Sequence, residues 1–223
     1  MPKLDNNIRY LQIAFNYNLR MAYRLLPEVT PSNRILIEAG TPFIKREGFR
    51  GIAAISQRWR GHVVADLKTA DGAVDEVNLA RQAGATAATV LGHSPLETLD
   101  LFIMRCNQLN MISMIDMLGI DDPLKVMRPL KIQPDVVVIH RGRDEESNSA
   151  KTIRYRHINR VRSKYNVLIS VAGGVDLKEA RSAVFNGANI VVANLVQPID
   201  KWSGILTSED IATVSRQFLE TIS

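Results

Sequence analysis

Short apolar runs rich in β-branched residues recur along the chain, and their spacing limits the folds that it can adopt. Eight such runs predict eight strands, with an average spacing of about 25 residues. Most are apolar on both faces, which is typical of parallel strands buried on both sides. The predicted strands cover residues 11–15, 34–38, 61–66, 86–91, 111–115, 135–139, 167–171 and 189–193.

Segments with helical periodicity separate these runs, for example residues 75–82 and residues 176–185. Strands that alternate with helices favour the α/β class. Eight such units in 223 residues predict a single-domain (β/α)8 TIM barrel over residues 1–223. An open doubly wound sheet is the alternative, but residues 15–18 after the first strand are not the glycine-rich phosphate loop of that fold.

The composition is that of an ordinary globular protein, with 46% hydrophobic and 23% charged residues, and it excludes disorder and collagen-like repeats. No apolar run approaches the ~20 residues of a membrane span. Residues 1–9 are polar and of mixed charge, unlike a secretory signal. The single cysteine, Cys106, excludes an intrachain disulfide and a cysteine-based metal site. We therefore expect a cytoplasmic protein with no membrane partner.

The formal net charge is +5, which could indicate nucleic acid, a membrane surface or a small anionic ligand. Residues 140–164 hold eight Lys/Arg residues and three acidic ones, so this segment carries the whole net charge. Within it, Ile153, Ile158 and Val161 form an apolar stripe, so the basic side chains are expected on a solvated helix face. We predict a small anionic substrate and no nucleic-acid partner.

In a barrel of this kind, functional residues lie at the carboxyl ends of the strands. Four of the predicted strands end in ionisable residues, which packing alone does not require. The residues expected at these ends include Asn16, Glu38, Asp66, Lys68, Asp116, His140, Arg143, Gly173, Gly174 and Asn194.

The most distinctive of these segments is Asp66-Leu67-Lys68-Thr69-Ala70-Asp71. Strand alternation predicts that Asp66 and Lys68 face the barrel mouth together, with Asp71 just beyond them. A lysine between two carboxylates stays protonated, and its ammonium can protonate a carbanion or stabilise an enediolate. An ordinary ion pair at the end of a strand is the alternative reading of this motif.

Neighbouring strand ends add groups for metal binding, proton transfer and anion binding. The carboxylates of Glu38 and Asp66 suit Mg2+, which would stabilise an enediolate. His140 can move protons near neutral pH, and Arg143 suits a carboxylate or phosphate. At Gly173-Gly174 the backbone N–H groups can approach an anion beside the N-terminus of the next helix.

Five segments in this order resemble the orotidine 5′-monophosphate decarboxylase suprafamily. Within it the chain is most similar to 3-hexulose-6-phosphate synthase and 3-keto-L-gulonate-6-phosphate decarboxylase. The segments are residues 37–45, 66–71, 89–92, 115–120 and 170–175.

The resemblance implies a (β/α)8 barrel that forms a homodimer with shared active sites and acts on a sugar phosphate. It implies Mg2+ bound by Glu38 and Asp66, Lys68 beside the enediolate, and Asp71 reaching to or from the partner subunit. The substrate-binding residues that we expect are Glu38, Asp116, Gly173, Gly174 and Asn194.

The two subfamilies share a Mg2+-stabilised 1,2-enediolate but differ in how it forms and reacts. Asp116-x-x-Gly119-Ile120 resembles the synthase, which joins ribulose 5-phosphate and formaldehyde in an aldol reaction. His140-Arg141-Gly142-Arg143-Asp144 resembles the decarboxylase. We favour the synthase, and a decarboxylase of the 3-keto-L-gulonate-6-phosphate or orotidine 5′-phosphate type is the alternative.

Two positions depart from the family pattern. The first strand of the family usually ends in aspartate, and here the residue is Asn16. After the eighth strand the family has Gly-Arg or Gly-Gly, which binds the substrate phosphate, and here the residues are Asn194-Leu195. The missing glycine makes a close backbone approach harder. A third hypothesis is therefore a diverged member with an altered substrate or a ligand-binding role.

Overall fold

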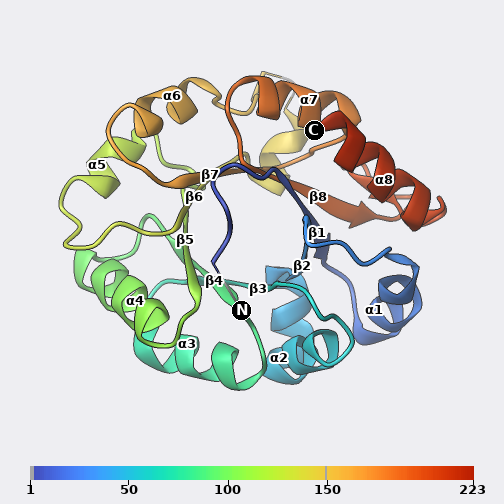
Figure 1. Cartoon of the computed structure of the whole chain (residues 1–223), viewed down its shortest axis with the longest axis horizontal. Coiled ribbons are helices and arrows are strands. Elements are labelled where there is room, and N and C mark those ends of the chain that lie inside the picture. The colour runs from blue at the N-terminus through green and yellow to red at the C-terminus, as the bar shows by residue number, and fades with distance from the viewer. Residues whose placement is uncertain (1–2, 149) are drawn as a thin grey trace.

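Parallel strands form a closed barrel at the centre of the molecule (Figure 1). The computed structural model describes residues 3–148 and 150–223. From β1 to β8 each strand pairs in parallel with the next in chain order, and β1 also pairs with β8, which closes the sheet. The strands are β1 Tyr10–Phe15, β2 Ile35–Ala39, β3 Val63–Thr69, β4 Ala87–Leu91, β5 Ile112–Asp116, β6 Val136–His140, β7 Leu168–Ala172 and β8 Ile190–Val196.

Helices surround the barrel (Figure 1), and this arrangement confirms the predicted (β/α)8 TIM barrel. The α-helices are α1 Leu19–Leu25, α2 Thr41–Ser56, α3 Ala73–Gln82, α4 Leu96–Gln108, α5 Pro123–Met127, α6 Arg156–Arg162, α7 Leu177–Phe185 and α8 Ile211–Thr221. Two short 3-10 helices are η1 Leu26–Glu28 and η2 Arg143–Ser147. Every predicted strand overlaps an observed strand along most of its length.

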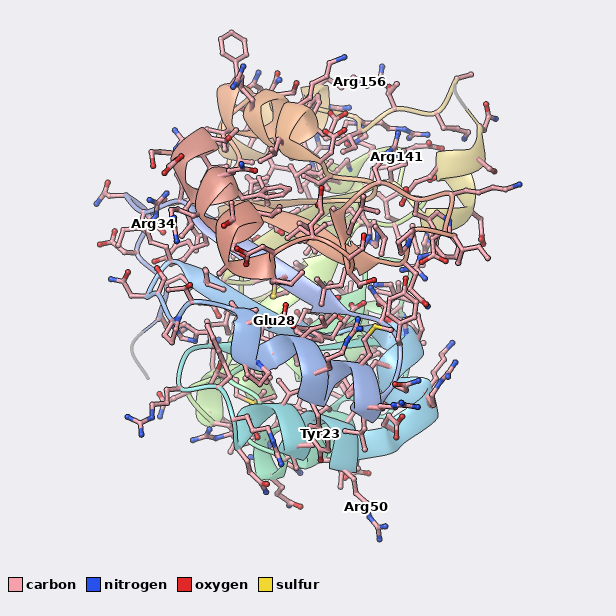
Figure 2. The ribbon with its side chains drawn as sticks, turned by 90° about the vertical axis from the view of Figure 1, so that its right-hand side faces the viewer. Tyr23, Glu28, Arg34, Arg50, Arg141 and Arg156 are labelled. Atoms are coloured by element: carbon pink, nitrogen blue, oxygen red, sulfur yellow. The ribbon has the colours of Figure 1, made fainter. Side chains whose placement is uncertain are left out.

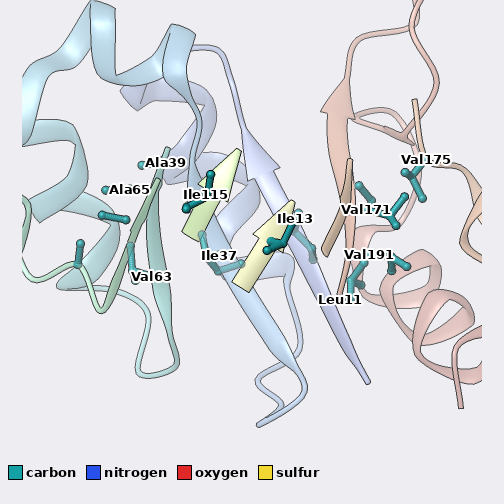
Figure 3. Packing of buried hydrophobic residues seen from close by; sticks show 14 of the residues in the cluster. Leu11, Ile13, Ile37, Ala39, Val63, Ala65, Ile115, Val171, Val175 and Val191 are labelled. Atoms are coloured by element: carbon teal, nitrogen blue, oxygen red, sulfur yellow. The ribbon is translucent and has the colours of Figure 1, made fainter. Parts of the chain in front are cut away.

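Alternating residues of the strands pack into two separate hydrophobic clusters. Ala14, Leu36 and Val64 belong to the cluster inside the barrel. Their neighbours Ile13 and Ile37 belong to the shell between strands and helices (Figure 3). Because both faces of each strand are buried, the continuous apolar runs of the sequence are explained.

The interior cluster ends at the carboxyl ends of the strands, where polar side chains replace apolar ones. The polar residues in this inward register include Gln12, Glu38, Asp66, Thr89, Asp116, His140 and Asn194. Figure 2 shows Arg34, which precedes β2, and Arg141, which follows β6, on opposite sides of the molecule. The side that carries Arg141 is the barrel mouth.

One strand was not predicted. After β8 the chain loops through residues 197–204 and returns as β9 (Ile205–Leu206), which pairs in parallel with Leu195 and Val196. A strand of two residues carries no periodic signal, so the sequence pattern could not reveal it.

The apolar stripe of the basic segment after β6 is buried, as predicted. Ile153, Ile158 and Val161 are buried. The ion pairs Arg154–Asp121, Arg160–Asp122 and Lys151–Glu145 hold three of its cations beside acids. Within residues 3–148 and 150–223, no helix is long and apolar enough to cross a membrane.

The last helix should contribute strongly to stability through Phe218, which is 1% exposed. We predict that Phe218→Ala lowers the free energy of unfolding by about 3–5 kcal/mol, because it removes a large buried side chain and leaves a cavity. Phe185→Ala is the matched control, since Phe185 is 91% exposed at the end of α7 and should change stability by about 0.5 kcal/mol or less. Urea denaturation measures both, and equal effects would contradict this packing.

Candidate active site

A cavity of about 410 Å3 opens at the barrel mouth. Most of the predicted site residues line it, namely Glu38, Asp66, Lys68, Asp116, His140, Arg143, Gly173 and Asn194. Two do not. Asp71 is exposed in the turn before α3, and its expected role between subunits stays a prediction. Gly174 lies beside the cavity, against the side chains of Arg141 and Glu146.

Lys68 forms the centre of the site. Its Nζ lies 2.7 Å from Asp66 Oδ2 and 2.9 Å from Asp116 Oδ2. Asp71 was the predicted second carboxylate near this lysine, so the structure corrects the partner to Asp116 on β5. The reason is local: the register of β3 shifts before Thr69, and Lys68 has a φ of 49°. Simple strand alternation therefore does not describe this segment.

The left-handed backbone of Lys68 costs about 1–3 kcal/mol in a non-glycine residue, so the surroundings must stabilise it. Thr89 does so from the neighbouring strand β4. The backbone N–H of Lys68 donates to Thr89 Oγ1 at 2.9 Å, and the Thr89 hydroxyl donates to Asp66 Oδ1 at 2.8 Å. Thr41 donates to Asp66 Oδ2 at 2.7 Å. Both threonines thus fix the Asp66–Lys68 pair.

Asp116 links Lys68 to His140. His140 Nδ1 lies 2.9 Å from Asp116 Oδ2, and Asp116 Oδ1 also accepts from the backbone N–H of Leu118 at 3.0 Å. The Asp116 carboxylate therefore fixes the imidazole ring of His140. The second ring nitrogen, Nε2, is left to accept or donate a proton.

The charges of this cluster stabilise one another. Burial alone raises the pKa of Asp116, but His140 and Lys68 hold it well below its usual range. Burial opposes the charge on Lys68, but Asp66 and Asp116 raise its pKa above the ordinary value. In the same way, burial lowers the pKa of His140 and Asp116 outweighs it, so the net shift is upward. The site thus holds a fixed ammonium and an imidazole that protonates readily.

Glu38 stands beside this cluster, and none of the described cationic side chains is in hydrogen-bond contact with it. Burial, and then the charge of Asp66, raise the pKa of Glu38 to about 7. Gln12 Nε2 donates to Glu38 Oε2 at 2.5 Å, while Gln12 Oε1 is buried and has no hydrogen-bond partner among the described residues. A buried carboxylate and an unpaired amide oxygen are groups that a hard cation would satisfy.

These residues fit a magnesium ion that only one or two protein carboxylates bind. The described residues contain no cluster of three or more acidic, histidine or cysteine side chains arranged as metal ligands. Mg2+ is commonly held by one or two carboxylates, with water and substrate oxygens completing its shell. Lys68, Thr41 and Thr89 already occupy the carboxylate of Asp66. An ion at Asp66 would therefore replace one of these hydrogen bonds.

No role was predicted for Gln12, Thr41, Thr89 or Glu146, which all line the cavity. Gln12 carried a usable signal, because it is a polar residue in an apolar strand and shares its inward register with Asn16. Thr41, Thr89 and Glu146 carried no such signal, because their roles depend on contacts between elements distant in sequence.

The chain matches the model of the Orotidine 5'-phosphate decarboxylase / HUMPS family over residues 9–194. It belongs to this family. A Bifunctional enzyme Fae/Hps of Methanothrix thermoacetophila is 35% identical over 215 residues, which cover 96% of this chain and 52% of that protein. A second, from Methanocella arvoryzae, is also 35% identical and is covered over 53% of its length. The chain thus spans about half the length of these curated relatives.

Solved structures of family enzymes share the barrel. The 3-hexulose-6-phosphate synthase from Salmonella typhimurium superposes with a TM-score of 0.83 at 26% identity, covering 96% of this chain and 98% of that one. The 3-keto-L-gulonate-6-phosphate decarboxylase from Vibrio cholerae has a TM-score of 0.75 at 20% identity, covering 97% of this chain and 98% of that one. At that identity the second likeness shows the fold alone.

The two departures from the pattern of the family occur on neighbouring strands. Asn16 Nδ2 donates to Asn194 Oδ1 at 2.9 Å, and both side chains line the cavity. Leu195 is 1% exposed and pairs with Ile205 of β9, so it lies outside the cavity lining. An amide pair and a buried leucine thus stand at the two positions where the sequence departs from the pattern of the family.

We predict that Lys68→Met lowers the free energy of unfolding by about 3–5 kcal/mol at pH 8 in the presence of EDTA, because Asp66 and Asp116 lose their shared cation. The depressed pKa of Asp116 stabilises the wild type above the pKa of unfolded aspartate, and this contribution is lost as the pH falls. The loss caused by the variant should therefore be smaller at about pH 3, below the pKa of unfolded aspartate. Urea denaturation at both pH values, with the exposed Lys45→Met as control, measures this; a loss independent of pH would contradict it.

We also predict that the His140 ring titrates above the ordinary histidine value of 6.5, since Asp116 raises its pKa. Asp116→Asn should lower this midpoint, because it removes the negative charge 2.9 Å from Nδ1. Nitrogen-15 NMR of the imidazole rings gives the midpoint directly. His62, whose pKa is lowered by burial, should keep its own midpoint in the variant. An unchanged His140 midpoint would contradict the assigned pairing.

Proposed function

We propose that this chain is a lyase of the 3-hexulose-6-phosphate synthase type, which adds formaldehyde to ribulose 5-phosphate through an enediolate. The observation that carries this proposal is the Lys68 ammonium bound by Asp66 and Asp116, with His140 on the other side of Asp116. Such a cluster offers a proton acceptor and a fixed positive charge in one cavity. The identity to Fae/Hps proteins and to a solved synthase supports this choice.

His140 supplies the proton transfer. In its neutral form, with Nδ1–H donating to Asp116, the lone pair of Nε2 takes the proton from C1 of ribulose 5-phosphate. The electron pair of the broken C–H bond forms the C1=C2 bond, and the electrons of the carbonyl bond move to the oxygen on C2. Asp116 stabilises the resulting imidazolium, so it acts as a positioning residue.

Lys68 stabilises the charge that develops on the enediolate oxygens, because its ammonium is fixed by two carboxylates before the reaction begins. C1 then attacks the carbon of formaldehyde, and the formaldehyde oxygen takes the proton back from His140. The carbonyl on C2 reforms, and the product is a six-carbon 3-ketose phosphate. No atoms are lost, as an aldol addition requires.

We further propose that Glu38 and Asp66 hold Mg2+ at this site. The raised pKa of Glu38 and the unpaired Gln12 Oε1 support this assignment. When bound, the ion supplies Lewis-acid stabilisation of the enediolate oxygens.

A decarboxylase of the 3-keto-L-gulonate-6-phosphate type is the second candidate, and Arg143 favours it. Arg143 lines the cavity, and its guanidinium lies over the Trp202 ring at 4.3 Å from the ring centroid. A cation held there can orient a carboxylate or assist the protonation that follows loss of CO2. Both candidates share the enediolate, so the substrate decides between them.

The aldol reaction is tested with purified protein, Mg2+, ribulose 5-phosphate and formaldehyde. We predict formation of a hexulose phosphate, a fall in kcat of about 100-fold or more in Lys68→Ala, and loss of activity with EDTA that Mg2+ restores. His140→Gln should lower kcat by about 100-fold or more while Lys45→Ala leaves it unchanged.

Product formation that is indifferent to Lys68 would refute the proposed mechanism. Release of CO2 from 3-keto-L-gulonate 6-phosphate, with no product from formaldehyde, would instead support the second candidate. Ligand binding without turnover of either substrate would favour a diverged, non-catalytic member of the family.

A further inference from the structure

The carboxylate of Glu146 lies against the glycine pair that follows β7. Glu146 belongs to η2, whose residues lie over the cavity at the barrel mouth, and it lines that cavity. A Cβ on Gly174 would lie 2.8 Å from Glu146 Oε2 and 2.3 Å from Arg141 Nη2. Gly173 and Gly174 have φ values of 104° and 65°, in the region that favours glycine. The absence of a side chain at Gly174 therefore leaves room for the Arg141 guanidinium and the Glu146 carboxylate beside this backbone, while Gly173 packs against the Arg141 carbonyl.

The surroundings of Glu146 are those of an anion site. The guanidinium of Arg141 donates to the backbone oxygens of Gly173 and Lys151, and the α7 N-terminus follows directly after the glycine pair. The backbone N–H of Ser203, from the loop of residues 197–204, points at Glu146 Oε2 from 3.4 Å. These are the groups that bind phosphate at the mouths of barrels of this type, where the loops after β7 and β8 meet a helix N-terminus.

Glu146 satisfies this site poorly. Its Oε1 atom is buried and has no hydrogen-bond partner among the described residues, and its bond from Ser203 is long. Burial raises the pKa of its carboxyl above the usual value, with Ser203 and Arg141 acting in the opposite direction. A carboxylate has two oxygens and at most one charge, whereas a phosphate has more of both, so a phosphate would use these donors better.

We propose that Glu146 competes with the substrate phosphate for an anion subsite formed by Gly173, Gly174, Arg141 and the backbone N–H of Ser203. This inference rests on the proposed function only in taking the substrate to be phosphorylated. It also accounts for the missing phosphate-binding residues after β8. Leu195 is committed to the pairing with β9, and the loop of residues 197–204 between the two strands supplies the donor instead.

In this arrangement Glu146 determines how tightly the protein binds phosphorylated ligands. Phosphate binding requires the carboxylate to withdraw, because two anions at one set of donors repel each other. Removing its charge should therefore strengthen the binding of phosphorylated ligands and lower KM. It should leave kcat nearly unchanged, since the Lys68–Asp116–His140 cluster has no hydrogen bond or ion pair with Glu146 among the described contacts.

Calorimetric titration with inorganic phosphate tests the proposal without requiring turnover. Glu146→Gln, which keeps the size of the side chain, should lower the Kd for phosphate by about tenfold or more. Asp144→Asn is the matched control, because it removes the same formal charge from the same 3-10 helix. Asp144 is exposed and lines the same cavity. The control should change the Kd by less than about threefold. Glu146→Asp, which retracts the carboxylate by one methylene, should give an intermediate affinity.

An unchanged Kd in Glu146→Gln, or an equal change in both amide variants, would overturn the proposal. If Glu146→Gln tightens phosphate binding but no variant turns over ribulose 5-phosphate, the subsite stands and the proposed function fails. If the wild type is active and Glu146→Gln changes neither Kd nor KM, the proposed function stands and this inference fails.

Discussion

The buried ammonium of Lys68 is the interaction on which the architecture of this site depends. A cation in a protein interior is tolerated only when carboxylates surround it, and here they come from β3 and β5. Asp116 must in turn be balanced by His140 from β6. One charge therefore fixes the relative positions of three strands. The closed barrel provides such fixed positions, because each strand from β1 to β8 is hydrogen-bonded on both sides.

This site also shows which features could be predicted from the sequence and which could not. The strands were predictable because both faces of each are buried, which leaves continuous apolar runs. The gathering of Glu38, Asp66, Asp116 and His140 followed from parallel strands ending at one edge. The pairing of Lys68 with Asp66 is confirmed, but the second carboxylate at Lys68 is Asp116 and not Asp71. A shift in the register of β3 and a left-handed backbone turn the chain away from simple alternation here. Such features arise from tertiary contacts with Thr89, and no local pattern encodes them.

The departures at β1 and β8 are physically linked, which the sequence alone did not show. Asn16 and Asn194 hydrogen-bond to each other at the mouth, so an amide pair satisfies both positions without a net charge. A carboxylate at either position would add to the negative charge already present at Glu38 and Asp66. The neutral pair thus limits the repulsion that Lys68 must offset, and it leaves two polar side chains that can contact the hydroxyl groups of a sugar.

The charge of the mouth is also less positive than the net charge of the sequence suggests. The net charge of +5 lies in the segment after β6, but Asp144, Glu145 and Glu146 line the cavity together with Arg143. Arg143 is held over Trp202 from the loop after β8, and Glu146 lies near Ser203 of the same loop. These contacts join the two loops across the cavity with one cation and one anion. Because three acidic side chains and one guanidinium line the cavity from this segment, displacement of one carboxylate makes the local field less negative. Affinity for an anionic substrate therefore depends on the position of this loop more than on the total charge of the protein.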